Sequence, residues 1–322
     1  MRRILEFIKR NSSIILTSHE GADADGIGAE MLMAHILEYM GKEVRIINAE
    51  PVASRYAFMN PEEKIEAWDE AKHRDIPEKS ALIIVDTSDE YHIGVLKGIL
   101  PRVKETLVID HHEPSPFSTL TGYIDSTASS TCEIIIDVAK KTGTVLDTAC
   151  AVAAFAGISY DTGSFAYKKT TAKTFKAALV LIKVGVVPSQ IYSALNENDS
   201  LGALLLQKQV LSSLKLHNMG RIAVQILKKE DLEATGGEFE EAEAFINVPL
   251  KSREVEVSIL IKENRKGIVR CSLRSKGQVN VSKIAQQFGG GGHATAAGFK
   301  SSQGIDETLT KVLEKIESVL DT

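Results

Sequence analysis

Short apolar runs alternate with helix-like segments through the first half of the chain. The runs rich in isoleucine, valine and leucine predict five strands, at residues 13–17, 43–48, 81–85, 106–109 and 122–124. Between the first two strands, residues 26–41 carry apolar side chains at helical spacing and end at Gly41, a common helix-terminating residue. Strands that alternate with helices are typical of parallel sheets. We therefore expect an α/β fold whose N-terminal part is a mostly parallel sheet flanked by helices.

The pattern changes near residue 129. Residues 129–197 are mostly helical in pattern, and a further helix is expected over 201–214. Beyond it come three β-rich runs, a short helix, a glycine cluster and a closing helix, at 221–227, 254–261, 267–275, 281–288, 289–292 and 306–320. We therefore expect two domains joined by a helical linker, the second being a smaller α/β unit, with boundaries at 1–197, 198–214 and 215–322.

The composition is that of an ordinary globular protein that can bury a large core, with 322 residues and 43% hydrophobic side chains. Charged residues such as Glu6 and Lys9 interrupt the N-terminal apolar segment, and no run approaches the roughly 18 apolar residues of a membrane span. We therefore expect a cytoplasmic protein. The three cysteines form no CxxC pair and are expected to be small core residues: Cys132, Cys150 and Cys271.

The net charge of −5 is unevenly distributed. The first 200 residues carry −7, whereas the rest of the chain carries +2. Between residues 262 and 300 the one acidic side chain is Glu263, and the basic side chains are Lys262, Arg265, Lys266, Arg270, Arg274, Lys276, Lys283 and Lys300. A stretch of this kind is either a phosphate-binding surface or a solvated face.

Carboxylates and imidazoles follow the predicted strands, where parallel sheets bind their ligands. The set comprises His19, Asp23, Asp25, Asp86, Asp110, His111, His112 and Asp161. Taken singly, an aspartate after a strand commonly caps the next helix. Together, however, these acids would repel one another unless metal ions neutralised them.

Oxygen ligands with one or two imidazoles suit Mn²⁺ or Mg²⁺. Two such ions about 3.5 to 4 Å apart, bridged by a carboxylate, generate a hydroxide and clamp a phosphoryl group. Phosphoester hydrolysis is therefore the leading chemistry. The other histidines do not belong to this set of acids and imidazoles at the predicted strand ends. They are expected to be structural or exposed: His35, His73, His92 and His217.

Four motifs in order, SHEGADADG, VDTSD, VIDHHEP and SYDTGSF, resemble those of the DHH phosphoesterase family. The C-terminal FGGGGHATAAGF is similar to the glycine-rich signature of the DHH-associated domain of that family. In size and layout the chain is most similar to the branch of oligoribonucleases and pAp phosphatases known as nanoRNases. The resemblance spans nearly the whole chain, and it implies that residues 1–197 are the catalytic domain and 215–322 the substrate-binding domain.

The resemblance also implies a site for two Mn²⁺ ions, with Mg²⁺ as the alternative. Asp86 would bridge the ions, and the six ligands would be His19, Asp23, Asp25, Asp86, His111 and Asp161. His112 would face the scissile phosphate, and Asp110 would orient a neighbouring histidine. In the second domain, the resemblance places substrate binding on Arg274, Gly289, Gly290, Gly291, Gly292 and His293.

Two positions depart from the family pattern. Gly21 and Ala22 stand where the first motif commonly has Asn-Pro, and His92 stands where an arginine often follows the second motif. The first change bears on the rigidity of the loop and removes no ligand. The second leaves open whether a substrate or structural contact made by that arginine exists in this chain.

We expect a hydrolase that cuts short RNA or DNA oligonucleotides, or pAp, to mononucleotides with a metal-activated water. Its substrate would lie between the two domains, and an aromatic content of 6% argues against a long stacking groove. The alternatives are a cyclic-dinucleotide phosphodiesterase, a RecJ-like single-strand exonuclease and a non-catalytic nucleic-acid-binding module. The preferred substrate, the cleavage polarity and the resident metal stay open, and a homodimer is suggested by relatives alone.

Overall fold

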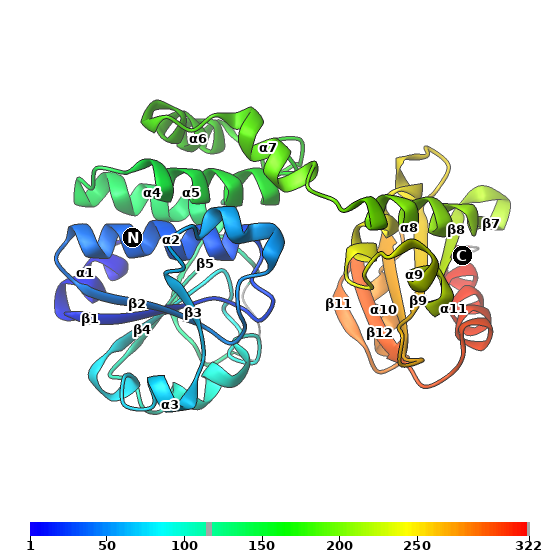
Figure 1. The fold of residues 1–322 in the computed structure, drawn as a ribbon, viewed down its shortest axis with the longest axis horizontal. Helices are drawn as coiled ribbons and strands as arrows, with labels where there is room; N and C mark the ends of the chain where they lie inside the picture. Colours follow the sequence, from blue (N-terminus) through cyan, green and yellow to red (C-terminus); the bar gives the residue numbers. More distant parts are fainter. Residues whose placement is uncertain (114–117, 321–322) are drawn as a thin grey trace. The chain divides into compact units, whose positions relative to one another are not determined.

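The computed structural model describes residues 1–113 and 118–320, except for the side chain of His293. The chain divides into two compact units, Met1–Asn198 and Asp199–Thr322. Each unit has a six-stranded sheet of its own, with apolar cores packed on both faces of the sheet. Figure 1 shows the two units, each built around its sheet.

The sheet of the first unit is parallel throughout its described strands, in the order β3-β2-β1-β4-β5-β6. The strand order changes direction between β1 and β4, which is where sheets of this kind leave a crevice for ligands. Four strands have the predicted bounds, β5 is one residue longer, and β3 was not expected. The strands are β1 Ser13–Thr17, β2 Glu43–Asn48, β3 Ile65–Ala67, β4 Ala81–Val85, β5 Thr106–Asp110 and β6 Gly122–Ile124.

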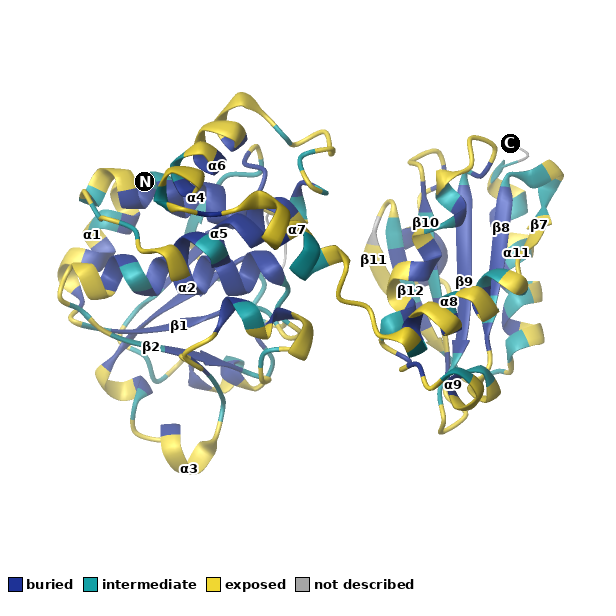
Figure 2. Cartoon of the chain, turned by 45° about the horizontal axis from the view of Figure 1, so that its top comes forward, coloured by how far each residue is buried: buried dark blue, intermediate teal, exposed yellow. Residues whose placement is uncertain are grey.

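Helices cover both faces of this sheet (Figure 1). On one face α2 lies against the sheet, α4 and α5 lie over α2, and α6 and α7 lie outermost. Because α2 is enclosed by the sheet and by other helices, it is buried along almost its whole length (Figure 2). The helices are α1 Arg2–Arg10, α2 Ala24–Tyr39, α3 Glu70–His73, α4 Thr131–Thr142, α5 Thr148–Asp161, α6 Ala172–Val184 and α7 Pro188–Asn196, with 3₁₀ turns η1 Ser54–Met59, η2 Pro77–Lys79 and η3 Gly94–Ile99.

Two glycines let the central helices approach one another closely. A Cβ added at Gly28 of α2 would lie 2.5 Å from the carbonyl oxygen of Ala153 in α5. A Cβ added at Gly157 of α5 would lie 2.6 Å from Sγ of Cys132 and 2.9 Å from Oδ1 of Asp25. No side chain fits at such distances. The start of α2, which carries Asp25, is thereby held against α5.

The sheet of the second unit is mixed, in the order β11-β12-β10-β9-β8-β7. The pairing of β8 with β9 is parallel, and the other described pairs are antiparallel. The expected strands form with slightly different ends, whereas β7, β11 and β12 were not expected. The strands are β7 Lys215–His217, β8 Ile222–Leu227, β9 Val257–Glu263, β10 Val269–Ser275, β11 Gly291–His293 and β12 Ala296–Ser301.

Helices also cover both faces of the second sheet. Those over one face are α10 and α11, whereas α8, α9 and η5 cover part of the other. Leu206 and Val210 of α8 are fully buried against Leu227 and Leu260 of the sheet. The helix expected as a linker within 198–214 is therefore part of the second unit. The elements are α8 Leu201–Ser212, α9 Lys229–Thr235, α10 Val281–Gln286 and α11 Ile305–Leu320, with η4 Asn218–Gly220, η5 Glu241–Asn247 and η6 Pro249–Lys251.

The architecture of the described residues confirms the predicted α/β fold, with a parallel first sheet and a smaller second unit. The three cysteines are free and buried, as expected. Within the described ranges, no helix is alone long and apolar enough to cross a membrane; α6 and α7 meet that test as a pair bent by 107°.

Candidate active site

The predicted metal ligands lie on segments that meet at the carboxyl edge of the first sheet. His19 follows β1, Asp86 follows β4 and His111 follows β5. Because β4 pairs with both β1 and β5, the three loops are neighbours. Asp25 lies in the first turn of α2, and Asp161 is the last residue of α5.

One group of potential ligands consists of His19, Asp23 and Asp86, with one ligand atom of each lying within 4.8 Å of the others. Nε2 of His19 lies 3.7 Å from Oδ2 of Asp86 and 4.0 Å from Oδ1 of Asp23. Nδ1 of the same ring is 2.9 Å from the carbonyl oxygen of Glu20, which leaves Nε2 directed at the two acids. Asp23 also caps α2, because its Oδ1 accepts from the backbone N–H groups of Asp25 and Gly26.

A second group consists of Asp25, His111 and Asp161, again within 4.8 Å of one another. Nε2 of His111 lies 2.9 Å from Oδ2 of Asp161 and 3.9 Å from Oδ2 of Asp25. The fully buried Asp25 accepts from the backbone N–H groups of Thr131 and Cys132 at the start of α4, at 2.6 and 3.1 Å. The N-terminus of a helix favours a carboxylate at this place.

Asp86 stands between the two groups. Its Oδ2 faces His19, whereas its Oδ1 lies 3.5 Å from Nε2 of His111 and accepts from Oγ1 of Thr131 at 2.9 Å. The backbone of Asp86 has a φ of 63°, in the left-handed region that aspartate adopts more readily than most residues. Each carboxylate oxygen therefore faces a different imidazole, which is the arrangement that a bridging ligand requires.

The electrostatics of this cluster are unfavourable without a cation. Burial raises the pKa of Asp86 well above its usual value, and Asp25, Asp23, Asp161 and Asp110 raise it further. Burial also raises the pKa of Asp161, to about 6. Carboxylates and imidazoles that converge in this way form a donor set for Mn²⁺ or Mg²⁺, so the residues fit a divalent pair.

His112 lies at the edge of the cluster, with Nδ1 3.8 Å from Oδ1 of Asp86, and is supported by Asp110. Nδ1 of His112 lies 2.8 Å from Oδ1 of the buried Asp110, which also accepts from the backbone N–H of His112 at 3.0 Å. Burial of Asp110 works against its charge, but the contacts with His112 outweigh burial, so the pKa of Asp110 lies below its usual value. The ring of His112 is 46% exposed, which leaves it accessible to a ligand.

Two residues at the cluster were not identified from the sequence. Thr131 holds both Asp25 and Asp86, and its only signal is the start of a helix after Ser130, which caps α4. Nζ of Lys169 lies 3.4 Å from the carbonyl oxygen of His111, so an ammonium group stands at the rim of the acid cluster. No motif marks Lys169, because its position depends on how the loop after α5 folds back.

The two departures from the family pattern lie beside His19. Gly21 has a φ of 61°, and its N–H donates to Oε2 of Glu50 at 3.1 Å. The carbonyl oxygen of His92 accepts from the backbone N–H of Glu20 at 2.6 Å. His92 therefore supports the loop that carries His19 through its backbone.

The other histidines have local partners or lie away from the cluster. His73 is buried, with Nε2 3.2 Å from Oε2 of Glu66, and His217 precedes η4 in the second unit. Nδ1 of His35 lies 3.2 Å from Oδ2 of Asp147, and Cys150 is near both. Burial raises the pKa of the Cys150 thiol to about 12.

In the second unit, Arg274 lies on β10 and is paired in register with Ala296 of β12, which pairs in turn with His293 of β11. Positions 274 and 293 therefore flank the same residue across three neighbouring strands. Arg274 is half-buried, and burial lowers the pKa of its guanidinium group. The side chain of His293 lies outside the described part of the structure.

The glycine signature forms a turn and the strand β11. Gly289 has a φ of 75° and Gly292 a φ of 136°. A Cβ at Gly290 would lie 2.2 Å from the carbonyl oxygen of Gly298, whereas one at Gly291 would meet nothing within 4 Å. Close contacts with the backbone therefore require glycine at Gly290 and Gly292, whereas Gly291 has neither a close contact at its Cβ position nor a positive φ.

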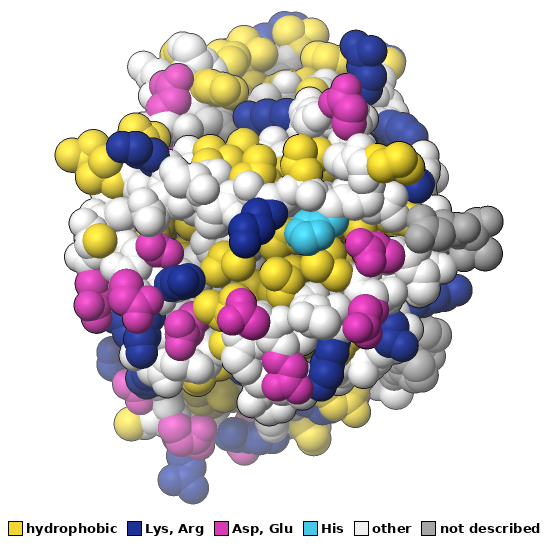
Figure 3. All heavy atoms as spheres, turned by 90° about the vertical axis from the view of Figure 1, so that its right-hand side faces the viewer, with side chains coloured by type: hydrophobic (Ala, Val, Ile, Leu, Met, Phe, Trp, Pro, Cys, Tyr) yellow, Lys and Arg dark blue, Asp and Glu magenta, His cyan; other side chains and the backbone are white. Residues whose placement is uncertain are grey.

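The basic stretch from 262 to 300 is not one continuous surface. Lys262 is fully buried, where its ammonium group contacts the carboxylate of Glu243 and lies 4.3 Å from the centre of the Phe239 ring. Burial lowers the pKa of Lys262. Figure 3 shows the side of the second unit on which β7 and α11 lie, and there basic and acidic side chains are mixed around an apolar area.

Comparison with known families and relatives agrees with this geometry. A profile described as the DHH family, N-terminal domain, matches residues 13–158, and a profile described as the DHHA1 domain matches residues 220–322. The chain is 26% identical to the bifunctional oligoribonuclease and PAP phosphatase NrnA of Thermus thermophilus, over 99% of this chain and 94% of that one. It is 29% identical to the probable bifunctional oligoribonuclease and PAP phosphatase NrnA of Streptococcus mutans, over 93% of each chain.

A different relative is the cyclic-di-AMP phosphodiesterase PdeA of Listeria monocytogenes, which is 26% identical over 98% of this chain and 48% of its own length. Among solved structures, an exopolyphosphatase-related protein from Bacteroides fragilis superposes with a TM-score of 0.91 at 25% identity, covering 100% of this chain and 97% of that one. RecJ of Thermus thermophilus shares the fold, with a TM-score of 0.52 at 13% identity over 96% of this chain and 52% of RecJ.

Proposed function

We propose that this chain, which carries an N-terminal DHH domain and a C-terminal DHHA1 domain, hydrolyses short oligonucleotides and pAp to mononucleotides. The observation that carries this proposal is the convergence of the two ligand groups at Asp86, whose Oδ2 faces His19 and whose Oδ1 faces His111. Relatives named for oligoribonuclease and PAP phosphatase activity match nearly the whole chain, which supports the choice of substrate. A cytoplasmic location is part of the proposal.

Each ligand group would hold one divalent ion, with Asp86 between them. His19 and Asp23 would complete the first site, and Asp25, His111 and Asp161 would complete the second. Bound there, two ions would supply a Lewis-acid pair that activates water and neutralises phosphoryl charge. Mn²⁺ is the proposed ion, because the donor set combines carboxylates with imidazoles, and Mg²⁺ is the alternative.

His112 would contact the phosphate directly, and Asp110 would act on it through His112. The exposed part of the His112 ring would donate a hydrogen bond to a phosphate oxygen as negative charge develops. Asp110 accepts from Nδ1 and thereby fixes the orientation of the ring and stabilises its positive charge. Lys169 would add a second cation at the rim of the cluster.

The second unit would hold a further phosphate of the substrate. Arg274 presents a planar guanidinium group that can pair with two phosphate oxygens at once. Gly291, at the start of β11, leaves the backbone open to a close approach, because nothing lies within 4 Å of its Cβ position. These two features support a role of the second unit in substrate binding.

One relative favours a second candidate function. PdeA is named as a cyclic-di-AMP phosphodiesterase and matches 98% of this chain, although the chain spans about half the length of PdeA. Hydrolysis of a cyclic dinucleotide would use the same ligand groups. The substrate panel below separates the two activities.

The test is to incubate the purified protein with Mn²⁺ and a panel of substrates. The panel holds RNA dimers to pentamers, pAp, cyclic di-AMP and long single-stranded DNA, and products are resolved by chromatography. We expect mononucleotides from the short RNAs and AMP from pAp, at higher kcat/KM than from the other two. Preferential turnover of cyclic di-AMP would favour the second candidate.

A carboxylate outside the cluster provides the control for substitutions of the candidate ligands, such as Asp86→Asn. Asp137 lies on α4, where it pairs with Lys140 and Lys173, and Asp137→Asn should leave turnover unchanged. Absence of turnover of every panel member by metal-loaded wild-type protein would refute the proposed hydrolase.

A further inference from the structure

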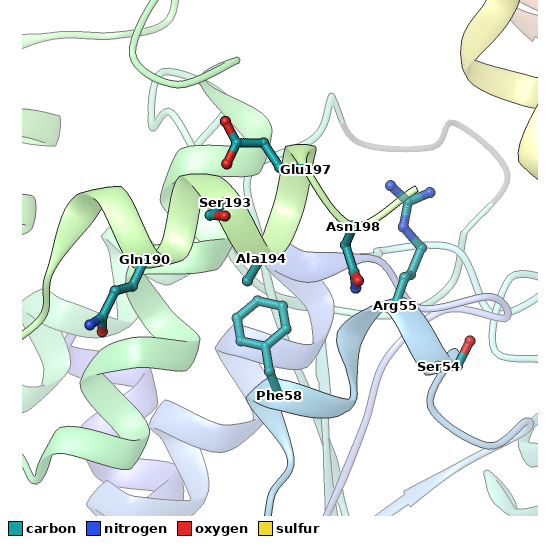
Figure 4. A pocket seen from close by; sticks show the side chains of 8 residues that line it. All are labelled: Ser54, Arg55, Phe58, Gln190, Ser193, Ala194, Glu197 and Asn198. Carbon is teal, nitrogen blue, oxygen red and sulfur yellow. The ribbon is translucent and has the colours of Figure 1, made fainter. Parts of the chain in front are cut away.

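A pocket of about 440 Å³ lies between η1 and α7, wholly within the first unit and outside the acid cluster (Figure 4). One wall comes from residues 54–58 and the other from residues 190–198. This volume is in the range of sites that bind small molecules. We refer to it as the η1–α7 pocket.

The lining of this pocket combines an aromatic ring, a cation and an amide. The partly buried ring of Phe58 points towards Ala194, and the side chains of Arg55 and Asn198 point in opposite directions (Figure 4). Arg55 is exposed and makes no ion pair with any described residue; its Cζ lies 5.2 Å from the centre of the Tyr56 ring. The carboxylate of Glu197 points away from Phe58 (Figure 4). The cation of the pocket is thus available to an anionic ligand.

The same turn joins the pocket to the acid cluster. Tyr56, between Arg55 and Phe58 in the sequence, meets the ring of Tyr160 edge-on, with 6.2 Å between the ring centres. Tyr160 directly precedes the potential ligand Asp161. A smaller pocket of about 110 Å³ is lined by residues that include His19 and Tyr56. Tyr56 therefore contacts the helix that carries Asp161, lines the smaller pocket together with His19, and directly follows Arg55 of the η1–α7 pocket.

We propose that the η1–α7 pocket binds the nucleotide adjacent to the one held at the acid cluster, with its base stacked on Phe58 and its phosphate paired with Arg55. This inference rests on the proposed function and specifies how the same enzyme would recognise an oligonucleotide. Any base can stack on an aromatic ring, and a guanidinium group without an ion-pair partner can bind a phosphate. This site therefore distinguishes substrates by their length and not by their base sequence. A substrate with a single nucleoside, such as pAp, does not fill it.

Two substitutions remove one contact each. Phe58→Leu removes the stacking surface and keeps an apolar side chain against the core, and Arg55→Gln removes the charge. We expect each to raise the KM for an RNA trimer by about 10-fold, the effect of one lost stacking or charge contact. The KM and kcat for pAp should stay within about 2-fold of wild type. Phe58→Tyr keeps the ring and should restore the KM for the trimer.

The matched controls are Phe175→Leu, an exposed phenylalanine on α6, and Arg10→Gln, an exposed arginine on α1. Neither should change the ratio of the two KM values. As an independent measurement, fluorescence anisotropy of a labelled RNA trimer in the presence of a chelator should show weaker binding by Phe58→Leu and Arg55→Gln, by the same factor as KM.

The outcomes separate the two proposals. If wild-type protein hydrolyses neither trimer nor pAp, the proposed function fails. If it hydrolyses both, and the variants bind and turn over the trimer as wild type does, or lose pAp turnover equally, the nucleotide site in the η1–α7 pocket is refuted and the proposed function stands.

Discussion

Three features of Asp86 are energetically costly. Its backbone is left-handed, its carboxylate is buried, and it lies near four other acids; burial and these acids together raise its pKa. A residue in such a conformation costs on the order of 1 to 3 kcal/mol and persists when its surroundings hold it in place. The hydrogen bond from Thr131 and the pairing of β4 with its neighbours supply that restraint.

The substitution Asp86→Asn separates charge from conformation. Asparagine tolerates the left-handed backbone, so the loop should keep its shape, whereas alanine would add strain. We expect kcat to fall by roughly 1,000-fold or more, because the carboxylate between the two sites is lost. The measurement is steady-state turnover of pAp with Mn²⁺.

The same variant should gain stability when no metal is present. A raised pKa means that the folded protein holds the proton of Asp86 where the unfolded chain has already released it, so stability is lost as pH rises through the folded pKa. Asp86→Asn removes this loss, and its melting temperature in a chelator at pH 8 should exceed that of wild type by a few degrees. An inactive variant with a lower melting temperature would instead indicate a damaged fold.

Glu30 makes a second prediction about pH. It is fully buried on α2, where its Oε2 accepts from Asn48 at 3.0 Å and burial raises its pKa to about 8. The unfolded chain releases this proton near pH 4.5, so stability is lost between about pH 4.5 and pH 8. Glu30→Gln should remove that loss. In urea unfolding, the variant should gain roughly 3 kcal/mol over wild type between pH 5 and pH 8, and parallel pH profiles would contradict the assignment.

At the level of secondary structure, the glycine turn before β11 offers a matched pair of substitutions. Gly290→Ala would push a methyl group against the backbone of Gly298 and should destabilise the protein by about 2 kcal/mol. Gly291→Ala meets open space and should change stability by less than about 0.5 kcal/mol. Urea unfolding followed by circular dichroism measures both, and equal stabilities would show that this turn relaxes easily.

Most strands of the first sheet could be predicted because they are runs rich in apolar residues, of which β4, ALIIV, is buried along its whole length. The strands that were not expected lack that signal. β3 and β7 are three residues long, and β11 and β12 consist largely of glycine and alanine. The pairing of β11 with β12 depends on the close approach that glycine allows, which is a property of the packed sheet.

The candidate site follows the same division. That acids and imidazoles would gather could be inferred, because they follow strands whose carboxyl ends share one edge. Which oxygen of Asp86 faces His19, and which faces His111, depends on the left-handed turn and on Thr131, and no sequence pattern specifies either. The contact of Lys169 with His111 likewise exists because a loop folds back after α5.

For the whole molecule, the candidate ligands all belong to the first unit, Met1–Asn198. Each unit has its own core, so we expect fragments 1–198 and 199–322 each to fold. Mn²⁺ should raise the melting temperature of the first fragment by several degrees and leave that of the second unchanged, because an ion stabilises only the fold that binds it. Thermal unfolding of each fragment, with and without Mn²⁺, is the measurement, and an equal shift in both would place metal binding elsewhere.

The tight contact at Gly157 has a consequence for ionic size. Asp25 and Asp161 belong to two helices that already touch through a glycine, so the gap between their carboxylates cannot widen unless the helices part. Calcium binds oxygen ligands at about 2.3 to 2.6 Å, whereas magnesium binds them at about 2.0 to 2.1 Å. We therefore expect the close contact at Gly157 to limit the size of the cation that these carboxylates can bind and to disfavour calcium.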